Sequence, residues 1–222
     1  MIVSGKTSAH VLMEAGALYA AYLLFWGIFE TISGIPLGYT THPIFVTLYA
    51  LAWIGISLFN FQNELDDWHP VPDRVRARVT LVLLFAVLGV FYTYVLPALP
   101  VVGAAVWWSS LPTLGGDPIF IIPKAFDIFF QQVLIIVSIL ALSRLFTDIR
   151  VVSLFYALGF GLAHLSLLLQ GSALPYAGIL AIAALGSAVV FPYLILRVKN
   201  GVVYTYSLHW LFYVALALLL RV

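Results

Sequence analysis

Long apolar runs separated by short polar breaks make up most of the chain. Interpreted as helices, the runs predict seven membrane spans at about residues 11–33, 43–62, 78–97, 119–146, 150–170, 174–196 and 202–221. Each run provides the roughly 20 apolar residues that a helix needs to cross a hydrocarbon core about 30 Å thick. The pattern therefore predicts an all-α fold, a polytopic transmembrane helical bundle that forms a single membrane domain over residues 1–222.

The segment 98–117 interrupts this pattern. Pro97, Pro100 and Pro112 break its apolar run, and Trp107 and Trp108 are typical of headgroup depth. We interpret it as a re-entrant or interfacial segment. If it crosses the membrane instead, the bundle has eight spans and every later element changes side. The segment completes an N-terminal part, residues 1–117, with three spans, and precedes a C-terminal part, residues 118–222, with four.

The composition places the chain in lipid and excludes several classes of function. Hydrophobic residues make up 64% and charged residues 9%, whereas an average globular domain is about half apolar and about a quarter charged. The formal net charge is +1 and no basic stripe follows any segment, so nucleic-acid binding is not expected. The chain has no cysteine, which excludes disulfides and thiolate chemistry. We expect the surface of the spans to contact a lipid bilayer.

The basic residues predict the orientation, because cytoplasmic loops carry an excess of Lys and Arg. With seven spans, the side of the N-terminus receives a large majority of them, and the other side receives only Lys124 and Arg221. The N-terminus is therefore predicted to be cytoplasmic and the C-terminus outside. The residues on the predicted cytoplasmic side are Lys6, Arg74, Arg76, Arg78, Arg144, Arg150, Arg197 and Lys199.

Polar side chains within the apolar runs are candidate site residues, because in a lipid-embedded helix they are costly unless they face the bundle interior. In the span 119–146, Asp127 and Gln131 are four residues apart and share a face. The spans 150–170 and 202–221 carry His164 and His209, and we expect these groups to form an interior chamber if the three spans meet. The alternative is that each side chain only ties helices together, contributing about 0.6–2 kcal/mol. The further candidates of this kind in the spans are Glu14, Glu30 and Gln132.

Two short motifs carry a family resemblance. The stretch FGLAHL contains Phe160 and His164 with Phe-x-x-x-His spacing, and VKNGVVYTYSLHWLFY places His209 four residues before Tyr213. From Phe126 onward the chain resembles the CPBP (CAAX-protease and bacteriocin-processing, or Abi) family of intramembrane proteases. Members carry Glu-Glu-x-x-x-Arg on one helix, Phe-x-x-x-His on the next and His-x-x-x-Asn, or a variant, on the last core helix. The resemblance implies a prokaryotic plasma membrane as the location.

The first family motif is degenerate here. Gln131 and Gln132 occupy the two glutamate positions, and Ile136 occupies the arginine position. The family site residues then correspond to Gln131, His164, His209 and Tyr213. In the family the glutamate is thought to act as a general base, and a glutamine cannot accept that proton at neutral pH, which commonly costs about 100-fold to 10,000-fold in rate. Asp127 lies one turn from Gln131 and is a possible substitute acid, about 6 Å away along the helix axis.

These observations support one hypothesis and leave two alternatives. The first is a catalytically degenerate CPBP-like pseudoenzyme that binds a membrane peptide, a lipidated substrate or a partner protein in the chamber. The second is an active intramembrane endopeptidase that uses Asp127 or another acid. The third is an accessory subunit of a membrane complex or a small-molecule transporter. No cofactor is expected and no metal, because two histidines with a glutamine make a poor zinc site.

Overall fold

The computed structural model describes residues 6–35, 37–66, 73–99, 117–165 and 174–219. Within these ranges every regular element is a helix and no strand is present. The prediction of an all-α polytopic helical bundle is confirmed.

Among the described residues, six helices are long and apolar enough to cross a membrane. They occupy Ser8–Ser33, Pro43–Asn60, Arg74–Ala98, Pro118–Leu145, Ala177–Arg197 and Gly201–Leu218, each within a few residues of a predicted span. A seventh helix, Ile149–Leu165, is shorter in the described residues, and its predicted continuation to residue 170 lies outside them. Almost all of the segment 98–117 also lies outside the described residues, so the choice between seven and eight spans stays a prediction. The chain is an integral membrane protein.

The first connection shows how local chemistry ends one helix and leads to the next. Helix α1 (Ser8–Ser33) begins where the Thr7 hydroxyl accepts a hydrogen bond from the backbone N–H of His10. It ends at Gly34, whose φ of 67° is left-handed and whose N–H donates to the Glu30 carbonyl. The Glu30 carboxylate then accepts the N–H of Leu37 at 2.7 Å. A glutamate within a predicted span thus stabilises the turn toward α2 (Pro43–Asn60).

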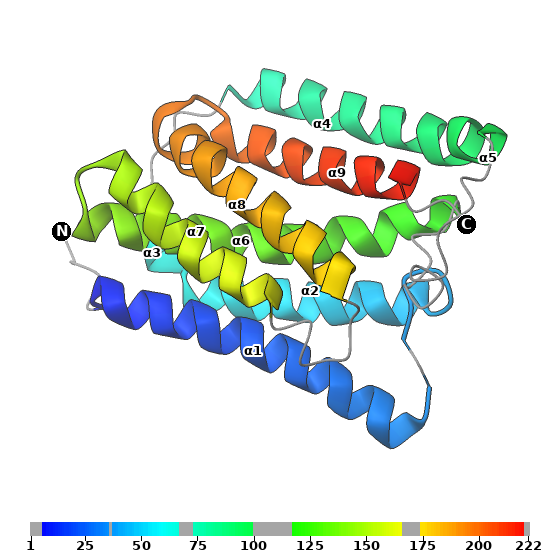
Figure 1. Ribbon diagram of the computed structural model, residues 1–222, viewed down its shortest axis with the longest axis horizontal. Coiled ribbons are helices and arrows are strands. Elements are labelled where there is room, and N and C mark those ends of the chain that lie inside the picture. The colour runs from blue at the N-terminus through cyan, green and yellow to red at the C-terminus, as the bar shows by residue number, and fades with distance from the viewer. Residues whose placement is uncertain (1–5, 36, 67–72, 100–116, 166–173, 220–222) are drawn as a thin grey trace. The chain divides into compact units, whose positions relative to one another are not determined.

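The contacts group the chain into two compact units. Unit 1 contains α1, α2, the short α3 (Gln62–Asp66) and α6 (Ile121–Leu145), which follows a 3-10 turn, η3 (Pro118–Phe120). Helix α6 packs against both α1 and α2 (Figure 1). Their shared core is rich in aromatic rings, and the Tyr22 ring lies 4.7 Å from that of Phe130 and 6.1 Å from that of Trp53. The other buried core residues are Val11, Ala15, Ile54, Phe61, Leu134, Val137 and Ala141.

Unit 2 contains α4 (Arg74–Val90), a π-helical turn η1 (Phe91–Val95), α5 (Leu96–Ala98), α7 (Ile149–Leu165), α8 (Leu174–Arg197) and α9 (Gly201–Leu219). Helix α8 packs against α7 and α9, and α4 packs against α9 (Figure 1). The Phe85 ring on α4 contacts those of Tyr206 and Trp210 on α9 at centroid distances of 6.3 and 6.2 Å. The two units differ from the division of the sequence at residue 117. Helix α4 precedes residue 117 but groups with α7, α8 and α9, and α6 follows it but groups with α1 and α2.

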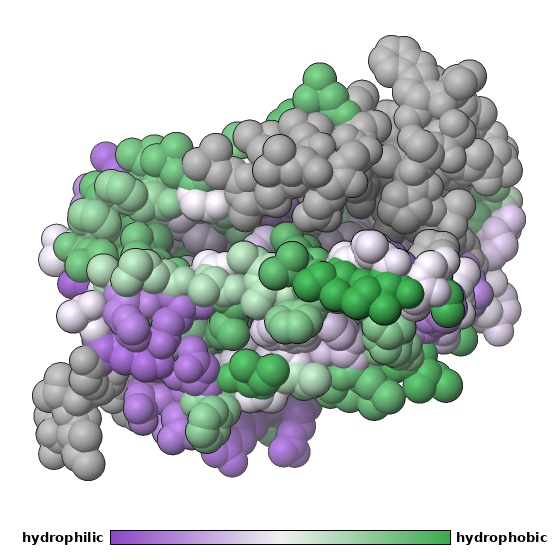
Figure 2. Space-filling model, turned by 90° about the horizontal axis from the view of Figure 1, so that it is seen from below, coloured by the Kyte–Doolittle hydropathy of each residue, from purple (hydrophilic) through white to green (hydrophobic). Residues whose placement is uncertain are grey.

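Large apolar side chains also cover the surface. Ile32, Ile44, Phe59 and Val75 expose 81%, 76%, 82% and 73% of their surface. Green, hydrophobic residues cover broad areas of the face in Figure 2. A water-exposed protein rarely shows apolar surface on this scale, whereas a lipid-facing surface requires it. The surface therefore agrees with the composition of the spans.

Candidate functional site

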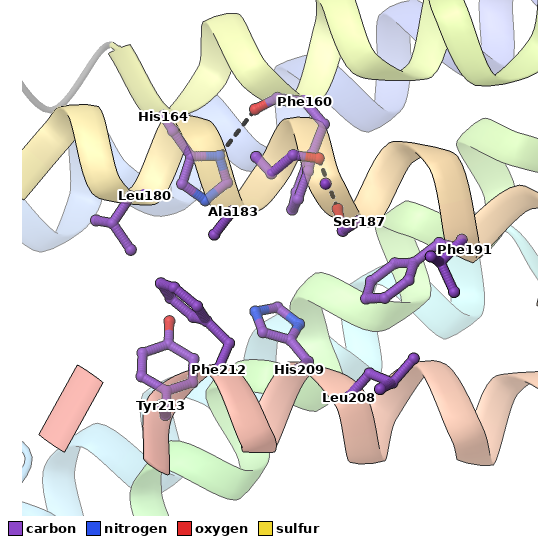
Figure 3. A pocket seen from close by; sticks show the side chains of 13 residues that line it. Phe160, His164, Leu180, Ala183, Ser187, Phe191, Leu208, His209, Phe212 and Tyr213 are labelled. Carbon is purple, nitrogen blue, oxygen red and sulfur yellow. Dashed lines mark hydrogen bonds between the residues drawn. The ribbon is translucent and has the colours of Figure 1, made fainter. Parts of the chain in front are cut away.

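A partly open cavity of about 300 Å³ lies between α7, α8 and α9 of unit 2. Its walls are mostly apolar, and its polar side chains are His164, Ser187, His209 and Tyr213 (Figure 3). The predicted site residues His164, His209 and Tyr213, which lie on two different helices, therefore line one cavity. The apolar lining residues are Phe160, Leu180, Ala183, Ala184, Gly186, Val190, Phe191, Leu208 and Phe212.

His164 is oriented by its own helix. Its Nδ1 lies 2.8 Å from the carbonyl oxygen of Phe160, one turn earlier (Figure 3). Because a carbonyl can only accept, Nδ1 donates, and a neutral His164 ring carries its lone pair on Nε2. The Phe160 ring packs edge-on against the imidazole at 4.7 Å and is itself stacked on Tyr156 at 5.2 Å. The Phe-x-x-x-His spacing thus sets both the tautomer and the ring direction.

His209 enters the cavity from α9. Its side chain is 9% exposed and its ring stacks on that of Tyr213 at 5.6 Å with an interplanar angle of 15°. The Phe191 ring of α8 approaches the imidazole at 6.4 Å. Trp210, the next residue, is fully buried and contacts Phe85 of α4. Packing of Trp210 between α9 and α4 therefore holds this part of α9, with His209 and Tyr213 lining the cavity (Figure 3).

Ser187 is a lining residue that sequence reasoning did not select. Its hydroxyl donates to the Ala184 carbonyl of the same helix at 2.7 Å (Figure 3). It lies between Gly186 and Ala188 in a run of small residues on α8. A single hydroxyl in such a run is an ordinary feature of a membrane helix. Only the packing of α8 against α7 and α9 distinguishes Ser187 from other serines in the spans.

Asp127 is the centre of a second polar cluster, in unit 1. Its Oδ1 accepts from the Tyr22 hydroxyl at 2.8 Å, and its Oδ2 accepts from the Tyr39 hydroxyl at 2.9 Å. Lys124, one turn earlier, pairs with Oδ2 at 2.7 Å, and the Gln131 amide donates to it at 3.2 Å. The carboxylate is 1% exposed. A buried charge is tolerated when it is paired and hydrogen-bonded, and Asp127 meets both conditions.

This arrangement gives Asp127 and Gln131 different surroundings from the histidines. Asp127 and Gln131, which the four-residue spacing places on one face of α6, are joined by a hydrogen bond. Both residues belong to unit 1, whereas His164, His209 and Tyr213 belong to unit 2. The oxygens of Asp127 are occupied by donors, which makes the carboxylate a poor proton acceptor for catalysis.

Lys124 is buried. It lies in the first turns of α6, inside the predicted span 119–146, and is 5% exposed, so it is not a solvated loop cation of the kind that the orientation rule counts. Its spacing of three residues from Asp127 is a helical ion-pair signal that the sequence contains. Tyr22 and Tyr39 are separated from Asp127 by 105 and 88 residues. No local pattern reveals those two partners.

Glu14, the other acid within the first span, forms a separate network at the start of α1. Lys6 and His10 pair with its carboxylate at 2.7 and 2.9 Å. The Asn60 amide of α2 donates to it at 3.3 Å, and Lys6 also donates to the Asn60 carbonyl at 3.0 Å. The network ties the beginning of α1 to the end of α2. Its geometry is that of a structural contact between helices.

Metal-ligand geometry is absent from the described residues. No group of three or more His, Asp or Glu side chains there is placed to hold a metal ion. Among the described residues that line the cavity, the nitrogen donors are two imidazoles and no carboxylate is present. Catalytic zinc normally takes three protein ligands. The lining is therefore a poor metal site.

No match to the chain was found among protein-family models, curated proteins or solved structures. Function is therefore inferred from residues and their geometry. Of the residues that carry the CPBP resemblance, Phe160, His164, His209 and Tyr213 line the cavity, whereas Gln131 and Gln132 lie on α6 of unit 1.

Proposed function

We propose that the chain is a CPBP-like integral membrane protein that binds an apolar segment of a membrane peptide or a lipidated protein, and that it does not cleave it. The observation that carries the proposal is the cavity between α7, α8 and α9, where His164, His209 and Tyr213 lie on otherwise apolar walls. These side chains belong to the two motifs, Phe-x-x-x-His and its partner on the last helix, that resemble the family.

The size and lining of the cavity indicate the class of ligand. At about 300 Å³ it lies at the lower limit for small-molecule sites, so it accommodates a side chain or part of an acyl chain. Leu180, Phe191 and Phe212 provide apolar walls. Backbone amides in a bilayer must be hydrogen-bonded, since leaving one unsatisfied costs several kcal/mol. The imidazoles and the Tyr213 hydroxyl give a bound amide or ester group polar partners inside the membrane.

Two features of the site argue against peptidase activity. In the family that the chain resembles the general base is a glutamate, and none of the described residues lining the cavity is a carboxylate. The Ser187 hydroxyl donates to a carbonyl of its own helix, which is not the arrangement of an activated nucleophile. Asp127, the possible substitute acid, already accepts from Tyr22, Tyr39, Lys124 and Gln131.

A pair of glycine substitutions on α8 tests the site. A Cβ at either Gly178 or Gly186 would meet no heavy atom within 4 Å, but only Gly186 lines the cavity. The probes are a transmembrane peptide carrying photo-leucine and a diazirine palmitate, each crosslinked to the purified protein in detergent. We expect Gly186→Leu to reduce labelling of α7 and α9 about ten-fold and Gly178→Leu to leave it unchanged. Equal labelling of the two variants would contradict the proposal.

Mass spectrometry of the same peptide tests the absence of cleavage. We expect the peptide to stay intact after long incubation with the wild-type protein. Cleavage that disappears in both His164→Ala and Asp127→Asn would establish the active endopeptidase instead. Stable co-purification of another membrane protein, with no probe labelling of the cavity, would favour an accessory subunit.

A further inference from the structure

One end of unit 2 concentrates basic side chains on three of its elements. The start of α4 carries Arg74, Arg76 and Arg78, and all of the basic residues at this end are exposed. The end of α8 and the start of α7 lie together because consecutive packed helices run antiparallel (Figure 1). The remaining members of this basic end are Arg150 on α7, and Arg197 and Lys199 at the turn between α8 and α9.

A hydrogen bond joins the two parts of the basic end that carry most of its basic residues, the start of α4 and the turn between α8 and α9. The buried Asn200 side chain donates from Nδ2 to the carbonyl of Asp73 at 3.2 Å, which ties the α8–α9 turn to the start of α4. Asn200 has a φ of 62°, and a Cβ on Gly201 would lie 1.7 Å from the Leu194 carbonyl oxygen. The turn between α8 and α9 therefore depends on an asparagine at position 200 and a glycine at position 201. Its geometry holds Arg197 and Lys199 beside the arginines of α4.

An aromatic ring further orients the arginines. The Arg76 guanidinium lies 5.9 Å above the ring of Tyr204 on α9, a distance typical of a cation–π contact. Tyrosine is itself enriched at headgroup depth. The guanidinium is therefore held before any ligand arrives, which lowers the entropy cost of binding.

The described acidic residues at this end form no ion pair with these cations. The carboxylates of Asp73 and Asp148 cap their own helices and accept the N–H groups of Arg76 and Arg150 at 3.1 and 2.9 Å. The ion pairs between described residues are Lys6–Glu14, His10–Glu14 and Lys124–Asp127. None of them involves the basic end. An excess of positive charge therefore faces outward.

The neighbouring surface indicates the depth of these charges. Exposed apolar side chains lie between and after the arginines of α4. They are Val75, Val79, Val82 and Leu83, which are exposed by 73%, 51%, 68% and 59%. In a membrane-spanning helix we expect such exposed apolar side chains to face hydrocarbon, which puts the arginines at the level where hydrocarbon gives way to headgroups. Guanidinium groups bind phosphate oxygens in a bidentate manner. We propose that the basic end of unit 2 is a binding site for the phosphate of anionic phospholipids in the surrounding leaflet.

The site is independent of the cavity and of the function proposed for it. The orientation predicted from the charges puts this end on the cytoplasmic side, where anionic lipids create a negative surface potential. Each basic residue near such a surface contributes about a five-fold gain in affinity. Loss of three arginines should therefore weaken lipid retention about 100-fold.

Native mass spectrometry of the full-length protein in detergent tests the site with phosphatidylglycerol and phosphatidylcholine as probes. We expect the wild type to retain phosphatidylglycerol preferentially. Lys199→Gln should weaken retention about five-fold and Arg74→Gln/Arg76→Gln/Arg78→Gln about 100-fold. The matched control is Lys6→Gln, which removes a cation already paired with Glu14 and should leave retention unchanged. Unfolding temperatures without lipid verify that the variants fold.

Three outcomes would overturn the lipid site. One is equal retention of the two lipids by the wild type, and another is an equal loss of retention in Lys6→Gln and Lys199→Gln. The third is displacement of phosphatidylglycerol by inorganic phosphate at the same concentration, because a free anion would then be the better ligand.

Discussion

The Asp127 cluster of unit 1 and the cavity of unit 2 place polar groups in apolar helices in opposite ways. In unit 1 the polar atoms meet one another: a lysine, two tyrosines and a glutamine all bond to one carboxylate. In unit 2 the imidazoles of His164 and His209 line an open volume of about 300 Å³. A closed network of polar groups stabilises helix packing, whereas polar groups that line a cavity lie where a ligand can contact them.

The type of side chain explains the difference. A charge in the membrane interior is costly, and it is retained where an opposite charge and hydrogen-bond donors offset its desolvation. A neutral imidazole or a phenol hydroxyl costs much less, so it can face a cavity without a charged partner. Unit 1 therefore needs its polar contacts for stability, and unit 2 can use its polar groups for recognition. The following substitutions separate these two roles.

The largest effect is expected from Asp127→Leu, which leaves Lys124 buried without its counter-ion. Removing one partner of a buried pair typically costs about 3–5 kcal/mol in the free energy of unfolding. Lys124→Met combined with Asp127→Leu should restore most of that loss, since it removes both charges. Reversible unfolding in mixed detergent micelles measures the free energy of unfolding of the single and the double variant. If the single variant lost less than about 1 kcal/mol, the cluster would not be a structural tie.

Restoring the family glutamates is expected to destabilise unit 1 without creating a peptidase. In Gln131→Glu/Gln132→Glu, a carboxylate replaces the amide that donates to Asp127 at 3.2 Å. Loss of that bond and the new repulsion should cost about 1–3 kcal/mol of unfolding free energy. Gln62→Glu makes the same change at an exposed position of α3 and is the control. Peptide cleavage by the double variant would show that Gln131 serves the cavity after all.

A substitution in the cavity should change recognition more than stability. His164→Leu keeps the size of the side chain but removes the imidazole that lines the cavity. We expect labelling by the photo-leucine peptide, which has amide groups, to fall about ten-fold, or about 1.4 kcal/mol. Labelling by a diazirine alkane without polar atoms should be unchanged. A parallel loss with both probes would mean that the histidine acts only through packing.

The smallest effect is expected from Tyr39→Phe, which removes one hydroxyl bond to Asp127 but leaves the Lys124 pair. Hydrogen bonds between membrane helices contribute about 0.6–2 kcal/mol, so the unfolding free energy should fall within that range. Tyr193→Phe, at a side chain that is 55% exposed, should have no effect. Equal behaviour of the two variants would indicate that Tyr39 contributes nothing to the cluster.

Local patterns predicted much of this structure. Hydropathy located the helices because each span must be apolar over its own length, independent of its neighbours. Spacing of four residues placed Asp127 and Gln131 on one helix face, where a hydrogen bond joins them, and the same spacing brings His164 to the Phe160 carbonyl. Motif spacing also selected His164 and His209, which line one cavity. The CPBP-like binding role stays a proposal, because a motif names positions and glutamines occupy the family's glutamate positions here.

The amino-acid sequence by itself determined that this protein is helical and apolar enough for a bilayer, and which side chains within its spans carry polar groups. Only the tertiary structure decided which of those groups meet. Tyr22 and Tyr39 reach Asp127 from 105 and 88 residues away, and Ser187 lines the cavity because α8 packs against α7 and α9. The physical reason is that hydropathy and helical periodicity are properties of one segment, whereas contacts between helices depend on how several lipid-compatible surfaces pack together.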